Sequence, residues 1–211
     1  MRALILIDLQ NDFCPGGNLE VPAGDEVITV ANQLMDHFDV IIASQDWHPA
    51  NHLSFAANHP WRRPGQVIDL NGTQQILWPM HCVQNSFGAE FAKGLRTDQI
   101  TKIVYKGTDP EIDSYSAFFD NAFQQSTGLD EYLQELDIDE VYIMGLATDY
   151  CVKFTVLDAL RLNYDVKLIT DGSRGIDLLE GDVEKAIQEM QEKGASIVTS
   201  KELIPKESTK K

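Results

Sequence analysis

The sequence predicts an α/β fold: a three-layer sandwich with a mainly parallel six-stranded sheet and helices on both faces. Short apolar segments rich in Val and Ile alternate along the chain with longer segments of helical periodicity, the pattern of parallel strands joined by helices. The chain has 211 residues, 43% of them hydrophobic, which is enough for one domain with a sizeable core.

Six short segments have the apolar character of buried strands. In chain order they are residues 3–7, 40–44, 103–105, 141–144, 166–169 and 196–198. Four helices are expected between them, because apolar residues recur there at helical spacing. These helices are residues 27–38, 129–136, 152–162 and 183–190, and Gly194 follows the last as a C-terminal stop.

Residues 47–99, after the second strand, interrupt this alternation. The segment is rich in Pro, His, Asn and Trp, and it contains four of the five histidines. A loop of this length inside a compact domain is usually functional, so we expect a metal-binding loop region here. We expect one domain over residues 1–211, with a frayed tail at residues 205–211.

Composition argues against several classes of partner. The formal net charge of −16 disfavours nucleic acid and anionic membranes. No charged-then-apolar leader opens the chain and no apolar run approaches a membrane span. Three cysteines are an odd number and too few for a disulfide framework. We therefore expect a soluble protein of a reducing compartment, the cytoplasm.

The most informative segment is residues 145–152, Gly-Leu-Ala-Thr-Asp-Tyr-Cys-Val. A predicted strand precedes it and a predicted helix follows it, so Cys151 is expected in the first helical turn, with Thr148 or Asp149 as the N-cap. The free N–H groups and the helix dipole at such a place favour an anion, so the thiol pKa should fall. The alternative is a cysteine buried as a small hydrophobic side chain.

Chemically active side chains follow four strands of the predicted sheet. Asp8 follows the first strand, Asp46 and His48 the second, Lys106 the third and Cys151 the fourth. Ligands bind beyond the carboxyl ends of parallel strands, so these side chains should meet. Lys106 would then favour a thiolate, and Asp8 would take the thiol proton and return it to a leaving amine. A turn-capping Asp8 and a surface Lys106 are the alternatives, but each follows an apolar strand, and buried charges need partners.

Asp46 and His48 also predict a metal site. Separated by one residue, they point to the same side of an extended segment. His81, in the long loop, would complete a three-ligand site with open positions, typical of a catalytic or substrate-binding metal. Candidates for a further contact are His52, Ser54 and, with less support because it adjoins His81, Cys82.

Together these segments resemble the isochorismatase-like cysteine hydrolases, and within them the nicotinamidases, also called pyrazinamidases. The resemblance runs from the first strand to the last. The matching segments are residues 7–13, 44–49, 78–83, 106–107, 113–118 and 145–152. The segments with Asp8, Lys106 and Cys151 mark the superfamily, whereas Asp-x-His at residues 46–48 and Trp-Pro-x-His-Cys at residues 78–82 are specific to nicotinamidases.

The resemblance implies a cysteine amidohydrolase that converts nicotinamide to nicotinate and ammonia through a thioester, also hydrolyses pyrazinamide, and serves NAD salvage. It implies one divalent metal ion: zinc, with manganese and iron also found in the family. By this resemblance the catalytic residues are Asp8, Lys106 and Cys151, and the oxyanion hole is formed by the N–H groups of Ala147 and Cys151, with a cis peptide between Leu146 and Ala147. The implied metal ligands are Asp46, His48 and His81, with His52 or Ser54 as an additional contact. The implied walls of the substrate pocket are Phe13, Trp78 and Tyr115.

Two other functions stay open at this point. A different amidase of the superfamily, acting on a carbamoyl or ureido compound, would use Asp8, Lys106 and Cys151 but not the metal residues. The second is a non-catalytic metal-binding or thiol redox protein on this fold. A redox role would need a resolving thiol near Cys151, which Cys14 or Cys82 could supply. A non-catalytic binding protein should lack Asp8, Lys106 or Cys151, and the chain has all three. The sequence does not decide the metal, the relative activity on the two amides, or whether the chain forms a homo-oligomer.

Overall fold

A parallel sheet of six strands forms the centre of the computed structural model, which describes residues 1–70 and 72–204. The strand order is β5-β2-β1-β6-β7-β8, and each neighbouring pair is parallel. The strands are β1 (Arg2–Ile7), β2 (Val40–Asp46), β5 (Lys102–Lys106), β6 (Glu140–Leu146), β7 (Asp165–Arg174) and β8 (Ser196–Val198). All six predicted strands are confirmed.

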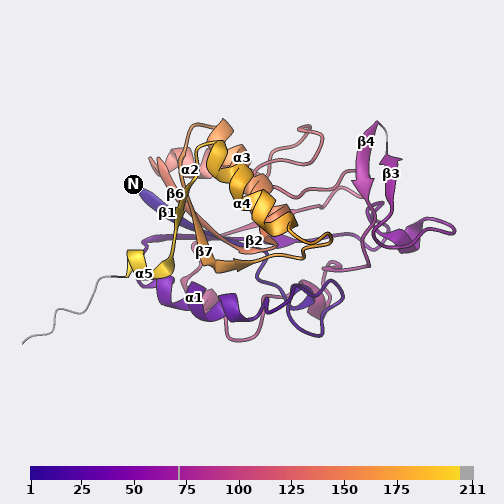
Figure 1. Ribbon diagram of the computed structural model, residues 1–211, viewed down its shortest axis with the longest axis horizontal. Helices are drawn as coiled ribbons and strands as arrows, with labels where there is room; N and C mark the ends of the chain where they lie inside the picture. Colours follow the sequence, from indigo (N-terminus) through magenta and orange to yellow (C-terminus); the bar gives the residue numbers. More distant parts are fainter. Residues whose placement is uncertain (71, 205–211) are drawn as a thin grey trace, which may run out of the picture.

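Helices cover both faces of this sheet (Figure 1). On one face are α1 (Glu26–Met35) and the short α5 (Ser200–Leu203), and on the other are α2 (Leu129–Glu135), α3 (Lys153–Arg161) and α4 (Asp182–Glu192). Successive side chains of a strand point to opposite faces. Leu4 and Leu6 of β1 therefore pack on the α1 side, and Ile5 and Ile7 on the side of α2, α3 and α4. Burial on both sides explains why β1 is apolar throughout.

The long segment after β2 contains regular structure that its sequence did not predict. A two-stranded antiparallel hairpin, β3 (Val67–Leu70) and β4 (Thr73–Ile76), projects from one end of the molecule (Figure 1). Three 3-10 turns lie in the same segment: Ala56–Asn58, Phe87–Ala89 and Thr97–Gln99. The hairpin lacks a buried apolar face to signal it, because Gln75 is the one buried residue of its two strands.

The end of α4 is as predicted. Gly194 follows α4 with a φ of +117°, the left-handed conformation that stops a helix. No helix in the described part of the chain is long and apolar enough to cross a lipid bilayer. The tail predicted to be frayed, residues 205–211, lies outside the described residues.

Candidate active site

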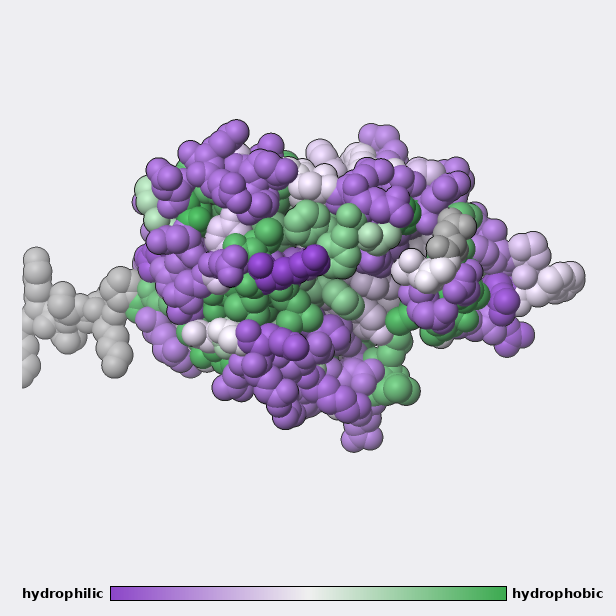
Figure 2. Space-filling view, turned by 90° about the horizontal axis from the view of Figure 1, so that it is seen from above, coloured by the Kyte–Doolittle hydropathy of each residue, from purple (hydrophilic) through white to green (hydrophobic). Residues whose placement is uncertain are grey.

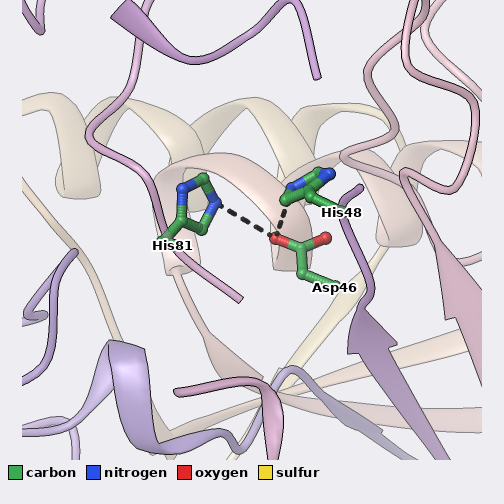
Figure 3. A group of neighbouring side chains, drawn as sticks. All are labelled: Asp46, His48 and His81. Atoms are coloured by element: carbon green, nitrogen blue, oxygen red, sulfur yellow. Dashed lines mark ion pairs between the residues drawn. The ribbon is translucent and has the colours of Figure 1, made fainter. Parts of the chain in front are cut away.

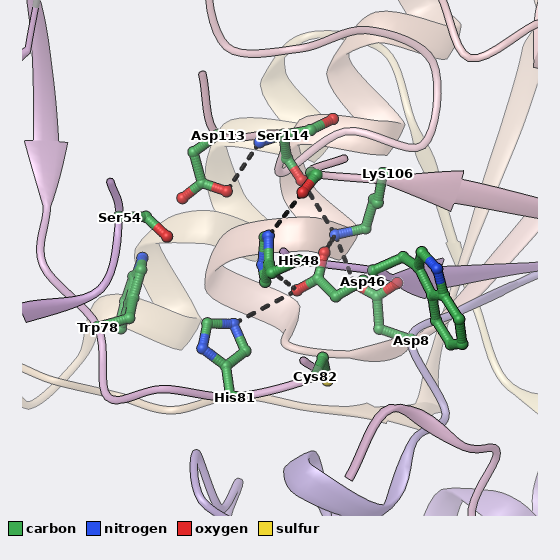
Figure 4. Close-up of polar contacts among 12 residues, drawn as sticks. Asp8, Asp46, His48, Ser54, Trp78, His81, Cys82, Lys106, Asp113 and Ser114 are labelled. Carbon is green, nitrogen blue, oxygen red and sulfur yellow. Dashed lines mark hydrogen bonds and ion pairs between the residues drawn. The ribbon is translucent and has the colours of Figure 1, made fainter. Parts of the chain in front are cut away.

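Four adjacent strands bring their carboxyl-terminal side chains together, as predicted. The register pairs Asp46 of β2 with Lys106 of β5, and Ile7 of β1 with Gly145 of β6. Asp8, directly after β1, is completely buried. Figure 4 shows Asp8, Asp46 and Lys106 pointing toward one another from three chain segments.

Lys106 is the cation at the centre of this group. Its Nζ lies 2.8 Å from Asp8 Oδ2 and 3.4 Å from Cys151 Sγ, and it donates to the Ser114 carbonyl at 3.1 Å. It also forms a short ion pair with Asp46 Oδ1. Burial lowers the pKa of Lys106, but the Asp46 and Asp8 carboxylates raise it more, so the net pKa lies well above the usual value. The side chain is therefore charged at neutral pH.

Asp8 is held in place by its backbone and by Ser44. Its φ of +50° is in the left-handed region, which aspartate tolerates better than most residues. Ser44 Oγ donates to Asp8 Oδ1 at 2.7 Å and accepts from the Asp8 N–H at 3.2 Å. Burial raises the pKa of Asp8, and although Lys106 lowers it, the net pKa is raised. A carboxylate with a raised pKa is a stronger base, as proton transfer requires.

Cys151 lies in a π-helical turn, Thr148–Val152, that leads directly into α3. The predicted place in a first helical turn is confirmed, but the predicted N-cap, Thr148 or Asp149, is wrong. Ala147 is the N-cap residue and makes no side-chain capping bond. Asp149 instead accepts hydrogen bonds from two backbone N–H groups of the loop after β7, at 3.0 and 2.8 Å, because these donors compete for its carboxylate.

The prediction that the Cys151 pKa falls is also wrong. Burial raises the pKa of the thiol, Lys106 lowers it, and the Asp8 and Asp46 carboxylates raise it again, so the net pKa lies well above the usual value. Loss of hydration outweighs the favourable charge beside the sulfur. At neutral pH the resting side chain is a thiol, and a thiolate requires a base to take the proton.

The backbone before Cys151 has the predicted unusual peptide bond. The Leu146–Ala147 bond is cis. Within the part of the chain that the structure describes, the Ala147 N–H donates no backbone hydrogen bond, whereas its carbonyl accepts from the N–H groups of Tyr150 and Val152, each at 3.1 Å. A free N–H beside the nucleophile is what an oxyanion hole needs.

The three predicted metal ligands converge (Figure 3). Asp46 is the last residue of β2, and His48 and His81 come from the long loop after it. The Nε2 atoms of His48 and His81 lie 3.6 and 3.5 Å from Asp46 Oδ2. One ligand atom of each residue lies within 4.8 Å of the others, and all three side chains are buried. With ligands about 2.1 Å from zinc in tetrahedral geometry, neighbouring ligand atoms are about 3.4 Å apart. The spacing of the three atoms fits such an ion.

Hydrogen bonds at the other ring nitrogens set the tautomers of both histidines. His48 Nδ1 lies 2.9 Å from the Gly107 carbonyl and His81 Nδ1 lies 2.8 Å from the Pro79 carbonyl. A carbonyl only accepts, so each Nδ1 has the hydrogen, and in the neutral, metal-binding form each Nε2 has the lone pair. Two lone pairs therefore face the Asp46 carboxylate, and a bound cation would satisfy all three. A side chain at position 107 would meet the His48 ring, so this position requires glycine.

His52 and Ser54 lie beside this group with unpaired polar atoms. His52 Nδ1 accepts from the Ser54 N–H at 3.1 Å, so the neutral ring has its hydrogen on Nε2. Burial and His48 lower the pKa of His52 to about 4, which keeps the ring neutral. Its Nε2 and the Ser54 Oγ are buried without a hydrogen-bond partner among the described residues. His52 also belongs to a second buried group, with His48 and Asp113, whose ligand atoms lie within 4.8 Å of one another, so it stays a candidate for a further contact to the ion.

A small, mainly apolar pocket lies over the Cys151 sulfur. The predicted walls Phe13, Trp78 and Tyr115 all line it. Sequence reasoning missed four further lining residues: Leu19, Asp113, Tyr150 and Ile176. Of these, Tyr150 and Asp113 stand in the matching segments 145–152 and 113–118, whereas Leu19 and Ile176 come from loops with no periodic signal.

Two buried side chains of the matching segment 7–13, Gln10 and Asp12, hydrogen-bond to the backbone of the site. The Gln10 amide donates to the Asp46 carbonyl and accepts from the Asp46 N–H, both at 2.8 Å. Asp12 accepts from the Cys82 N–H at 2.7 Å, directly after the predicted ligand His81. Neither role was predicted. Their place after an apolar strand, beside Asp8, was the available signal.

Cys14 and Cys82 do not pair with Cys151. All three thiols are free and buried. Cys14 and Cys82 pack with the core on the α1 side of the sheet, and Cys151 packs with the core on the opposite side. Burial raises the pKa of both Cys14 and Cys82, so neither is a reactive thiolate at neutral pH.

Comparison with known proteins places this geometry in a family. The family model described as Isochorismatase domain matches residues 2–202. The chain belongs to the isochorismatase family. Among its members, the chain is 54% identical over 205 residues to a nicotinamidase of Escherichia coli K12, covering 94% of both chains. The isochorismatase-family resemblance in the sequence is thus confirmed.

Solved structures of isochorismatase-family proteins agree with the fold. An Acinetobacter baumanii nicotinamidase superposes with a TM-score of 0.93 at 45% identity, over 96% of this chain and 98% of the other. A Pyrococcus horikoshii pyrazinamidase, solved in complex with zinc, has a TM-score of 0.76 at 39% identity, over 94% of this chain and 98% of the other. The fit of the three residues to a cation and this zinc-bound relative together support a metal in this family member.

Proposed function

We propose that the chain is a metal-dependent nicotinamidase that hydrolyses nicotinamide to nicotinate and ammonia and also accepts pyrazinamide. Asp46 provides the main support, because it joins two sites. One of its carboxylate oxygens pairs with Lys106 of the thiol site, and the other faces the two histidines of the candidate metal site. A nucleophile and a metal site that share one carboxylate fit an amide substrate with a second donor atom, as nicotinamide has.

In the proposed reaction, Asp8 takes the proton of the Cys151 thiol as the sulfur attacks the amide carbon. The raised pKa of Asp8 suits it to this step, and the raised pKa of Cys151 requires it. Asp8 then returns the proton to the leaving ammonia, and water hydrolyses the thioester with Asp8 as base. Lys106 remains charged throughout and offsets the negative charge that moves between the sulfur and Asp8.

The backbone supplies the oxyanion hole in this proposal. The N–H groups of Ala147 and Cys151 would hold the oxygen of the tetrahedral intermediate, an effect worth about 3 kcal/mol for each donor in other hydrolases. Phe13, Trp78 and Tyr115 would enclose the pyridine ring, since all three line the pocket over the sulfur.

Asp46, His48 and His81 would hold one divalent ion, whose open position would offer a Lewis-acidic contact to the pyridine nitrogen. We propose zinc, with manganese and iron as alternatives, because two imidazoles and one carboxylate suit it. His52 or Ser54 would supply the additional contact, since both have buried polar atoms without a hydrogen-bond partner among the described residues.

The two competing functions have less support. An amidase for carbamoyl or ureido compounds would have no use for the three converging lone pairs at Asp46, His48 and His81. A thiol redox protein needs a resolving thiol, but the other two thiols pack on the opposite side of the sheet from Cys151. A non-catalytic binding protein has no need of a buried lysine between a base and a nucleophile.

The proposed cellular setting is the cytoplasm, where nicotinate would enter NAD salvage. Three free cysteines without a disulfide fit a reducing compartment. The family match over residues 2–202 supports one hydrolase domain over the chain.

The test is an ammonia-release assay on nicotinamide and on a ureido compound with purified protein, with metal analysis of the same sample. We expect turnover of nicotinamide and about one equivalent of metal per chain. Turnover of the ureido compound alone would reject the proposal.

A further inference from the structure

A large groove lies directly outside the catalytic pocket, between the β3–β4 hairpin and the helices α3 and α4. Its volume is about 580 Å³. The surface is hollowed between the hairpin and the body in Figure 2, where the hairpin lies at the right. The hairpin residues Val67, Gln74 and Ile76 form one wall, and Phe154 and Ala186 lie on the other. The proposed reaction makes no use of this space.

Two tyrosines line both the pocket and the groove: Tyr115 and Tyr150. The Tyr150 ring lies perpendicular to the Trp78 ring with centroids 5.0 Å apart, and 5.7 Å from the Tyr115 ring. These rings form the partition between the two spaces. A substituent that reached from the pocket into the groove would have to pass this partition.

Tyr115 is fixed in the partition. Its hydroxyl accepts from the Trp78 indole N–H at 3.1 Å and from the Gln75 amide at 3.4 Å. Its ring stacks on Phe154 with centroids 5.3 Å apart. The side chain is thus held at its hydroxyl and on its ring face, and rotation would break these contacts.

Tyr150 lacks an anchor at its hydroxyl and is held by ring contacts alone. Across residues 1–70 and 72–204 its hydroxyl makes no hydrogen bond, and the side chain is partly exposed. The backbone beneath it is held on both sides, since Asp149 accepts two hydrogen bonds from the loop after β7 and the Cys151 carbonyl accepts from Thr155 Oγ1 at 2.7 Å. Any opening of the partition is therefore a rotation of the Tyr150 side chain.

We propose that Tyr150 is the gate that sets the size of amide the enzyme accepts. In the observed rotamer it separates the catalytic pocket from the groove, and its truncation joins the two spaces. This inference rests on the proposed function, and it names a specificity residue for that reaction. The added substrates are pyridine carboxamides with a second, uncharged ring.

The charges of the groove explain why the second ring is uncharged. Lys153 pairs with Glu189 at 3.5 Å, and Lys185 pairs with Asp182 at 3.2 Å. Both lysines that line the groove thus already have a carboxylate partner, and neither is left free for a phosphate or carboxylate. Its apolar walls favour an aromatic group instead.

The test compares nicotinamide with 5-phenylnicotinamide on the metal-loaded protein. The phenyl group stands on the ring carbon that is meta to both the nitrogen and the carboxamide, so it hinders neither. We expect Tyr150→Ala to reduce the preference for nicotinamide in kcat/KM by about tenfold or more, chiefly through a lower KM for 5-phenylnicotinamide. Tyr150→Phe, which keeps the ring, should retain the wild-type preference, as should Tyr132→Ala on α2. An unchanged preference in Tyr150→Ala would overturn the gate.

A second measurement keeps this test separate from the proposed function. Alkylation of Cys151 by small iodoacetamide and by bulky N-phenylmaleimide is compared, with the labelled peptide identified by mass spectrometry. Tyr150→Ala should raise the rate with the bulky reagent relative to the small one, and Tyr150→Phe should not. If the wild type fails to hydrolyse nicotinamide, the proposed function fails, but this ratio still decides the gate. Equal ratios in wild type and Tyr150→Ala would reject it.

Discussion

The Lys106 ammonium lies 3.4 Å from the Cys151 sulfur, and both side chains are buried. The same cation contacts Asp8 at 2.8 Å. A proton that moves from Cys151 to Asp8 therefore leaves the net charge around Lys106 unchanged. This arrangement lowers the free-energy cost of forming the thiolate inside the protein, so Cys151 need not be permanently ionised. A raised thiol pKa is therefore compatible with a nucleophilic role.

Cys151→Ala should abolish amidase activity and leave the fold and the metal in place. The side chain is the only thiol on its side of the sheet within the described residues, and the proposed metal ligands lie on other segments. Ammonia release and metal content of the purified variant are the measurements. More than a trace of ammonia from nicotinamide would show that the nucleophile is another group.

Lys106→Met should destabilise the protein and slow alkylation of Cys151 at neutral pH. Without the ammonium, the Asp8 and Asp46 carboxylates are buried without a cation, a change that costs about 3–5 kcal/mol for a broken buried pair. The thiol pKa should also rise, because Lys106 is the group that lowers it. Denaturant unfolding and iodoacetamide labelling measure the two effects.

Lys102→Met is the matched control, because Lys102 lies on the same strand but is exposed. It should alter the free energy of unfolding by less than about 1 kcal/mol. Equal effects of the two substitutions would show that Lys106 has no special electrostatic role.

Cys14 should make stability fall at alkaline pH. Burial and the nearby Asp25 raise the pKa of its thiol from 9.0 to about 11. A raised folded-state pKa means that the unfolded chain loses the thiol proton first, so the stabilising contribution is complete below pH 9 and is lost as the pH rises toward 11. The free energy of unfolding of wild type and Cys14→Ala should therefore converge between these pH values. A constant difference across that range would contradict the assignment.

The sheet, its helices and most of the site were predictable because their signals are local. Apolar strands and helical periodicity are visible in short windows, and the carboxyl ends of parallel strands meet by topology. Asp8, Lys106 and Cys151 each follow such a strand, so their meeting followed from strand order. The hairpin at β3 and β4 lacks this signal, because Gln75 is the one buried residue of its two strands.

What the sequence could not predict depends on competition between distant groups. The thiol pKa of Cys151 depends on how completely the fold excludes water, which outweighs the helix start and Lys106. The role of Asp149 depends on N–H groups of the loop after β7, which are far away in sequence.

Asp12→Ala should weaken metal binding although Asp12 is not a proposed ligand. Its carboxylate accepts from the N–H groups of Cys82 at 2.7 Å and Asn18 at 3.1 Å, and Cys82 has a φ of +45° directly after His81. Loss of these bonds frees the turn that orients His81. Metal affinity, measured by competition with a chelator, should fall about 10- to 100-fold. Asp98→Ala, at an exposed aspartate of the same loop region, should leave it unchanged, and an equal affinity in both variants would refute the role.

Removal of the metal should distinguish substrate positioning from a structural role. We expect chelation, or His48→Ala, to slow nicotinamide hydrolysis on the order of a hundredfold, since a shift of about 1 Å in a reacting group can cost that much. Benzamide has the same shape but no ring nitrogen. It should be a poor substrate of the metal-loaded protein, and chelation should slow its single-turnover acylation little, because Asp8, Lys106 and Cys151 do not touch the ion directly in the proposal.

A metal that only fastens the loop of residues 47–99 to the sheet would behave differently. Chelation would then slow acylation by both amides to the same extent, and the melting temperature would fall sharply, because Asp46 and His81 connect β2 to that loop. Single-turnover acylation rates on the two amides, before and after chelation and with thermal melts alongside, decide the matter. Selective loss on nicotinamide supports positioning by the metal, and parallel loss on both amides rejects it.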